Sequence, residues 1–137
     1  MVADLGNLAS VVAARRPSPE TKASKAFWDA AGEGRLLVKQ CDDCGEHHHY
    51  PRAACPFCGS ERLQWRQASG KGTIYSFSVM RRAEVPYIIA YVTLAEGPTM
   101  MSNIVDADAD AVRIGQAVTL KFNASEGGPP MPVFTPA

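Results

Sequence analysis

Two copies of the motif C-x2-C-G constrain the fold of this chain more than any other feature. The first copy spans Cys41 to Gly45 and the second spans Cys55 to Gly59, with ten residues between the two inner cysteines. Two residues between cysteines let one tight turn aim both sulfurs at the same point, and the glycine after each pair can adopt the positive φ that closes such a turn. The sequence therefore predicts one tetrahedral four-sulfur metal site.

Zinc is the metal that we expect at this site, as one structural ion per chain. A disulfide framework is disfavoured because nothing in the sequence indicates an oxidising compartment, and a redox C-x-x-C pair explains one motif but not both. Iron is the alternative, because rubredoxin holds iron with the same four-sulfur set and would make the chain an electron carrier. A site closed by four sulfurs has no position for an activated water, so the zinc is not expected to be catalytic. The predicted ligands are Cys41, Cys44, Cys55 and Cys58.

The charge balance of the chain disfavours some classes of function. Lys plus Arg and Asp plus Glu each number 14, so the formal net charge is zero. This balance disfavours nonspecific nucleic-acid binding, which depends on an excess of Lys and Arg. No stretch approaches the roughly 20 apolar residues of a membrane helix, and residues 1–16 lack the apolar run of an export signal. We therefore expect a cytoplasmic protein with no membrane partner.

Local signals divide the chain into three parts. Residues 1–35 are expected to form an N-terminal helical segment, with a weak amphipathic helix before Pro17 and a second helix from Pro19 to Ala31. Residues 36–67 contain both cysteine motifs and form the predicted zinc ribbon. Residues 68–137 form the third part, with strands predicted at 73–82, 87–94, 99–105 and 117–122.

These strands predict a mainly β fold whose C-terminal part is an OB-fold, a Greek-key β-barrel, because no long helix separates them. Tyr75 and Phe77 are expected in the barrel core, since aromatic residues at a period of two are usually core. The tail from Gly127 to Ala137 is too rich in proline for a central strand, and Val133 and Phe134 are expected to anchor it to a surface.

The three histidines of the chain lie between the two cysteine pairs, at His47, His48 and His49. We expect a solvated hairpin tip here, because a histidine ligand would leave one cysteine without a role. With all four cysteines occupied and all histidines in one cluster, no nucleophile–base pair for acyl transfer is available. No catalytic residue is therefore expected in this chain.

A series of short motifs resembles one known family. The series runs in the same order as in the small proteins catalogued as domain of unknown function thirty-five, and it covers residues 19–122, so that residues 1–17 fall outside it and have no assigned role. The motifs are Phe27-Trp28, Gly34-Arg35-Leu36, both C-x2-C-G turns, Tyr50-Pro51-Arg52, Gly70-Lys71-Gly72-Thr73-Ile74-Tyr75-Ser76, Pro86-Tyr87, Glu96-Gly97-Pro98, Asn103-Ile104-Val105-Asp106 and Arg113-Ile114-Gly115.

The resemblance implies a rubredoxin-like zinc ribbon followed by an OB-fold, and an accessory role in acyl-CoA metabolism. Members resemble subunits or fused domains that work with thiolase-like enzymes. The carbon–carbon bond beside the CoA thioester would be made or broken by that partner, a thiolase or an aldolase. This chain would complete the assembly, bind CoA or acyl-CoA near the partner, and have no activity alone.

Five residues are candidates for these contacts. Arg52, Arg81 and Arg82 are candidates for CoA phosphates, because guanidinium groups pair bidentately with such oxygens. Phe27 and Trp28 are candidates for the partner interface, on a helix expected to pack against the partner or the ribbon and not against the barrel. The alternative function is an OB-fold nucleic-acid module, which both fold types allow and the charge balance disfavours.

Overall fold

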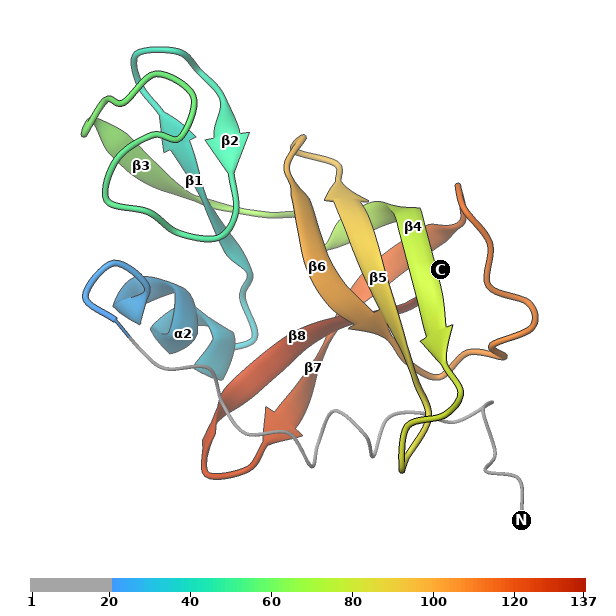
Figure 1. The fold of residues 1–137 in the computed structure, drawn as a ribbon. Helices are drawn as coiled ribbons and strands as arrows, with labels where there is room; N and C mark the ends of the chain where they lie inside the picture. The colour runs from blue at the N-terminus through green and yellow to red at the C-terminus, as the bar shows by residue number, and fades with distance from the viewer. Residues whose placement is uncertain (1–20) are drawn as a thin grey trace.

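The computed structural model describes residues 21–137 and combines one short helix, a small three-stranded sheet and a closed barrel (Figure 1). The mainly β architecture predicted from the sequence is confirmed. The amphipathic helix expected before Pro17, and the expected start of the second helix at Pro19, lie outside the described residues.

Helix α2 spans Lys25–Gly32 and follows a turn at residues 21–24, so its described part is shorter than the predicted helix. The exposed face carries an ion pair of 3.0 Å between Lys25 and Asp29, four residues apart. The opposite face is buried and carries Phe27, Trp28, Ala30 and Ala31. This helix is therefore anchored by two aromatic side chains and two alanines that let the backbone approach its neighbours closely.

The ribbon is a three-stranded antiparallel sheet in the order β2-β1-β3. Its strands are β1 (Leu37–Cys41), β2 (His47–His48) and β3 (Leu63–Gln67). Leu36 and Val38 are buried, while the intervening residues are more exposed, as period-two alternation requires. The first cysteine of the metal site is thus the last residue of a strand whose position is set by core packing.

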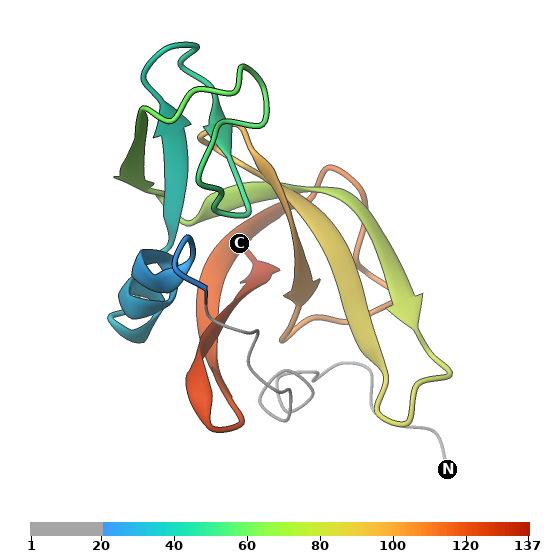
Figure 2. The ribbon, with the colours of Figure 1, turned by 60° about the vertical axis from the view of Figure 1, so that its left-hand side comes forward.

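The barrel contains five strands in the order β4-β5-β6-β8-β7, and it closes through antiparallel pairing of β4 with β7. Closure leaves no exposed strand edge, which is how small OB-folds avoid edge pairing. Figures 1 and 2 show the ribbon at one end of the molecule and the connection between β4 and β5 at the other end. The strands are β4 (Lys71–Met80), β5 (Tyr87–Leu94), β6 (Thr99–Ile104), β7 (Ala117–Ser125) and β8 (Gly128–Pro136).

The proline-rich tail forms strand β8, which lies between β6 and β7 in the closed barrel, so the expectation that it is unsuited to a central strand is wrong. It pairs along its length with β7 and touches β6 at one register pair, Ile104 with Phe134. The carbonyls of Pro132 and Phe134 accept hydrogen bonds from the Ser102 hydroxyl and the Val105 N–H. Even-numbered residues of β8 therefore direct their backbone N–H and carbonyl groups toward β6. Few hydrogen bonds form between β8 and β6, so a proline at these positions sacrifices little by lacking an N–H donor.

Strand β4 contains a β-bulge that changes the expected position of one aromatic residue. The register with β5 shifts between Ile74 and Ser76, so Tyr75 has no opposing residue. As a result Tyr75 is 69% exposed, while Phe77 packs against the core. The prediction of a core position is confirmed for Phe77 and wrong for Tyr75.

The helix, the ribbon and the barrel share one hydrophobic core. Phe27 and Trp28 belong to the same buried cluster as Leu36 of the ribbon lead-in and Ile74 and Phe134 of the barrel, and α2 contacts β8. The expectation that this helix would not pack on the barrel is therefore wrong. Phe27 and Trp28 are buried within the chain, and their contact with a partner subunit stays a prediction.

Candidate metal centre

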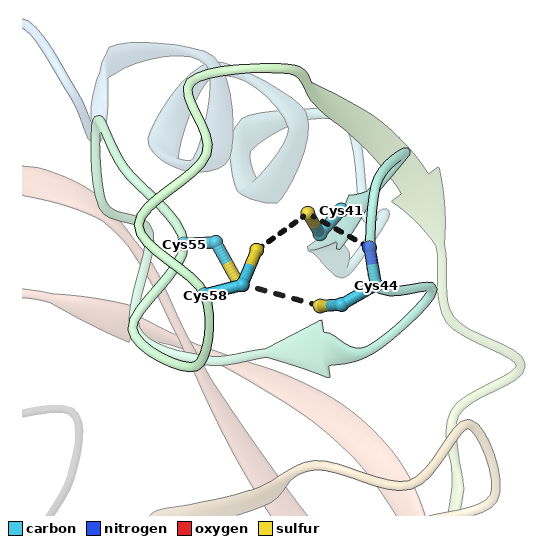
Figure 3. A group of neighbouring side chains, drawn as sticks. All are labelled: Cys41, Cys44, Cys55 and Cys58. Atoms are coloured by element: carbon cyan, nitrogen blue, oxygen red, sulfur yellow. Dashed lines mark hydrogen bonds between the residues drawn. The ribbon is translucent and has the colours of Figure 1, made fainter.

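The four cysteine sulfurs converge on one point between the two turns (Figure 3). All four Sγ atoms lie within 4.8 Å of one another, with 3.5 Å between Cys41 and Cys58 and 3.7 Å between Cys44 and Cys55. A tetrahedral zinc with Zn–S distances of about 2.3 Å places its sulfurs about 3.8 Å apart. The cluster therefore has the size that a zinc or iron tetrathiolate needs.

Both turns use the same backbone geometry to aim their sulfurs. Gly45 and Gly59 have φ values of 77° and 80°, and their N–H groups donate to the carbonyls of Cys41 and Cys55 over 2.9 Å. Residues with a Cβ rarely adopt such a φ, so glycine at these two positions follows from the turn geometry. The first cysteine of each pair is buried and the second is exposed.

Backbone N–H groups also point at the sulfurs. The N–H of Cys44 approaches the sulfur of Cys41 at 3.5 Å and lowers the pKa of that thiol to about 7. The N–H of Phe57 approaches the sulfur of Cys55 at 3.4 Å. The lowered pKa favours the thiolate at Cys41, and the thiolate is the form that binds metals, whereas the pKa values of Cys44 and Cys58 are raised in the cluster without a metal. When bound, the ion would supply a cross-link between the two turns.

A hydrogen-bonded group of three side chains ties the turns together outside the sulfur cluster. Asp43 of the first turn forms an ion pair with Arg62 and accepts a hydrogen bond of 2.5 Å from Ser60, which follows the second turn. These donors, Arg62 first, lower the pKa of the Asp43 carboxyl. The two cysteine turns are therefore held in register by side chains, in addition to the cross-link that a bound metal would supply.

The histidines do not form a solvated tip, which corrects the expectation from the sequence. His48 is buried, and neither of its ring nitrogens has a hydrogen-bond partner among the described residues. His49 packs against the rings of both Phe27 and Tyr50, with centroid distances of 5.4 Å to each, and these two rings also contact one another. Burial lowers the pKa of both histidines, that of His49 to about 4, so both are neutral near pH 7.

The two aromatic residues of α2 contact the ribbon, as the sequence analysis expected. Phe27 and Trp28 pack edge to face at 4.8 Å, and the indole N–H of Trp28 donates to the hydroxyl of Tyr50 over 2.8 Å. This contact fixes the loop after β2 against the helix. Sequence periodicity could place the aromatics on one helix face, but it carried no signal for their partner.

The three arginines are not brought together. Arg81 and Arg82 lie in the connection from β4 to β5, whereas Arg52 lies in the ribbon at the other end of the molecule (Figures 1 and 2). All three are exposed, and Arg81 forms an ion pair of 2.8 Å with Asp110. One CoA site built from all three within this chain does not fit this placement.

An exposed apolar row crosses the outside of the barrel and was missed by the sequence analysis. It consists of Tyr75 on β4, Tyr91 on β5 and Met101 on β6, which we call the outer row. Tyr91 and Met101 are register partners, and the bulge places Tyr75 next to the partner of Tyr91. The sequence did contain an indication of this row. In β5 and β6, the alternate positions that face outward carry large apolar side chains, where polar side chains are usual.

Comparison with known proteins gives the chain its family. Residues 28–64 match the model of the ChsH2 rubredoxin-like zinc ribbon domain, and residues 65–123 match that of the ChsH2 C-terminal OB-fold domain. A DUF35 domain-containing scaffold protein of Methanothermobacter thermautotrophicus is 37% identical over 94 residues, which are 64% of this chain and 71% of that protein. The chain belongs to the ChsH2/DUF35 family. The resemblance seen in the sequence is thus confirmed.

Longer members of the ChsH2/DUF35 family match as well. A probable enoyl-CoA hydratase alpha subunit of Thermomonospora curvata is 35% identical, and a 3-oxo-4,17-pregnadiene-20-carboxyl-CoA hydratase alpha subunit of Mycobacterium tuberculosis is 32% identical. The matches cover 90% and 78% of this chain but 41% and 35% of those subunits. The chain therefore spans about two-fifths of the length of these curated relatives.

Solved structures agree with the fold. A chain of the Ltp2-ChsH2(DUF35) aldolase superposes with a TM-score of 0.76 at 32% identity, covering 88% of this chain and 98% of that chain. A DUF35-family protein of unknown function from Sulfolobus solfataricus has a TM-score of 0.63 at 13% identity, which supports the fold alone. No helix among residues 21–137 is long and apolar enough to cross a membrane.

Proposed function

We propose that this chain is a non-catalytic accessory subunit of a thiolase-like enzyme that makes or breaks a carbon–carbon bond next to a CoA thioester. The observation that carries the proposal is the likeness to a chain of the Ltp2-ChsH2(DUF35) aldolase, which extends over 98% of that chain. The two hydratase subunits are more than twice as long as the matched region, so hydration is not assigned to this chain.

The chemistry of the described residues supports an accessory role. All four cysteines lie in one sulfur cluster, the buried His48 is part of the ribbon sheet, and the half-buried His49 packs against aromatic rings. A buried neutral imidazole next to no thiol or hydroxyl nucleophile is a poor general base for acyl transfer. The reacting groups are therefore assigned to the partner, and the metal, proposed to be zinc, is assigned a structural role.

The outer row is the proposed docking surface for the thiolase-like subunit. Tyr75 and Met101 are 69% and 59% exposed, and with Tyr91 they form one apolar strip across three strands. Tyrosine and methionine are enriched at the cores of protein interfaces. An exposed apolar strip lowers the solubility of a protein unless a partner covers it. This supports a covered outer row in the assembled enzyme.

The CoA contacts are proposed for the connection between β4 and β5. Arg82 makes no hydrogen bond or ion pair with the part of the chain that the structure describes, and Arg81 pairs with an exposed carboxylate of Asp110. Exposed pairs of this kind contribute little, so a phosphate can replace the carboxylate at small cost. Arg52 would contribute to CoA binding only through a partner subunit that reaches both ends of this molecule. A cytoplasmic location is part of the same proposal.

Co-expression with a thiolase-like subunit tests the proposal. We expect the two chains to co-purify, and acyl-CoA carbon–carbon bond cleavage to require both. Replacing Tyr75 and Tyr91 together with aspartate is expected to abolish co-purification, while the control Val85→Asp, at a residue 53% exposed in the connection between β4 and β5 and away from the outer row, leaves it unchanged. Cleavage by this chain alone, or tight salt-sensitive binding to single-stranded nucleic acid with no subunit partner, would refute it.

A further inference from the structure

A cavity of about 590 Å³ lies between α2, the loop after β2 and the barrel strands β5, β6 and β8. Phe27 and Trp28 line it from the helix, His49 and Tyr50 from the ribbon, and Met101 from the barrel. Each part of the chain thus contributes to its wall. Its size falls in the range of about 300–1,000 Å³ that is typical of small-molecule sites.

The lining is apolar and uncharged. Aromatic residues from the helix and the ribbon line it, together with three methionines of the barrel, Met100, Met101 and Met131. Methionine side chains are flexible and adapt to ligands of different shapes. None of the lining side chains within residues 21–137 is charged, so the cavity is suited to an uncharged group and not to a phosphate.

Two polar groups from consecutive residues remain available in this wall. The Nδ1 atom of His49 is buried and has no hydrogen-bond partner among the described residues. The Tyr50 hydroxyl accepts a bond from Trp28 and keeps its own proton free to donate. The other polar side chains are engaged, since Ser102 donates to Pro132 and Asn103 donates through its amide to Ile88. A ligand oxygen would satisfy the groups that the fold leaves open.

We propose that this cavity binds the apolar acyl part of an acyl-CoA thioester, with one acyl oxygen hydrogen-bonded to His49 or Tyr50. This inference rests on the proposed function for the substrate class, while the cavity itself follows from the geometry. Met101 both lines the cavity and belongs to the outer row, so the opening lies at the proposed partner surface. The acyl group would be held where the two chains meet, next to the catalytic residues of the partner.

Calorimetric titration of the zinc-loaded full chain with octanoyl-CoA and with free CoA tests the proposal. We expect octanoyl-CoA to bind at least about tenfold more tightly than CoA, because the lining can bury the alkyl chain. Met101→Trp is expected to fill the opening and weaken octanoyl-CoA binding about tenfold or more. The control Ile114→Trp, at a residue 68% exposed that lies outside the cavity and outside the connection carrying Arg81 and Arg82, is expected to leave it unchanged.

A second variant tests the polar wall. His49→Phe keeps a ring in place but removes the unpartnered nitrogen, so binding of octanoyl-CoA is expected to fall about tenfold while the melting temperature is retained. His47→Phe changes a histidine of the same hairpin outside the cavity and is expected to bind like wild type. Retained binding in a folded His49→Phe protein would show that His49 is packing alone.

The two proposals fail in different ways. Equal affinity for CoA and octanoyl-CoA, or full affinity in Met101→Trp, overturns the acyl site even if the chain still co-purifies with a thiolase-like subunit. Tight octanoyl-CoA binding without any co-purification would instead leave the acyl site standing and remove the accessory role.

Discussion

Burial of His49 makes the stability of this protein depend on pH in a way that one substitution should remove. Burial lowers the pKa of His49 from 6.5 to about 4, with a smaller contribution from neighbouring His48. The unfolded chain therefore binds more protons than the folded chain between these two values. The stabilising effect of the neutral imidazole is complete above about pH 6.5 and is lost as the pH falls toward 4.

The size of the effect follows from the linkage relation. A histidine whose pKa moves from 6.5 in the unfolded chain to about 4 in the folded one removes about 2 kcal/mol of stability between about pH 7.5 and about pH 5. The loss reaches about 3 kcal/mol near pH 4. A His49→Phe variant lacks this titration. Near neutral pH it gives up no hydrogen bond of Nδ1, so its free energy of unfolding is expected within about 1 kcal/mol of wild type.

Urea denaturation of both proteins at a series of pH values measures the difference. Zinc release in acid affects both proteins alike, because the cysteine site is the same, so the comparison isolates His49. His47→Phe, which removes a histidine from the same hairpin and keeps His49, should show the wild-type loss. If wild type and His49→Phe lose stability in parallel to within about 0.5 kcal/mol, the buried neutral imidazole is refuted.

Two further outcomes are expected. Cys58→Ser should reduce bound zinc from one equivalent per chain to less than half by elemental analysis, and destabilise the ribbon by an amount on the order of 10 kcal/mol; full zinc retention would exclude the four-thiolate site. Gly72→Ala should lower the free energy of unfolding by about 1–3 kcal/mol in urea, because the new Cβ would lie 2.6 Å from a methyl group of Val92. Gly32→Ala, at the open end of α2, should raise it by up to about 1 kcal/mol, and a destabilisation equal to that of Gly72→Ala would contradict the steric argument.

The metal site was predictable from local sequence because its geometry is local. Each C-x2-C-G turn aims its own two sulfurs, and the motif alone predicts the positive φ that Gly45 and Gly59 adopt. Bringing the two turns together needs one short sheet, which the apolar residues before Cys41 also indicated. The geometry of the two cysteine turns and of the short sheet does not depend on how the ribbon packs against the barrel.

The environment of the histidines was not predictable in this way. Polar residues between two metal-binding turns are typical of an exposed tip, but α2 folds back over this loop and buries His49 against Phe27. The helix and the loop are separated by the whole first turn and β1. Their contact depends on packing between distant segments, and no short pattern encodes it.

The sequence by itself determined the pairing of the two cysteine turns in one sulfur cluster, the order of ribbon and barrel, and most of the strand positions, because these depend on spacing and on period-two alternation within short segments. The tertiary structure alone decided three other features. Pro130, Pro132 and Pro136 of β8 are tolerated because their backbone groups face the sparsely bonded seam with β6. The bulge in β4 turns Tyr75 outward to create the outer row. Contacts among α2, the ribbon and the barrel form the cavity and bury the Nδ1 atom of His49, since close packing of three separate segments sets what each side chain meets.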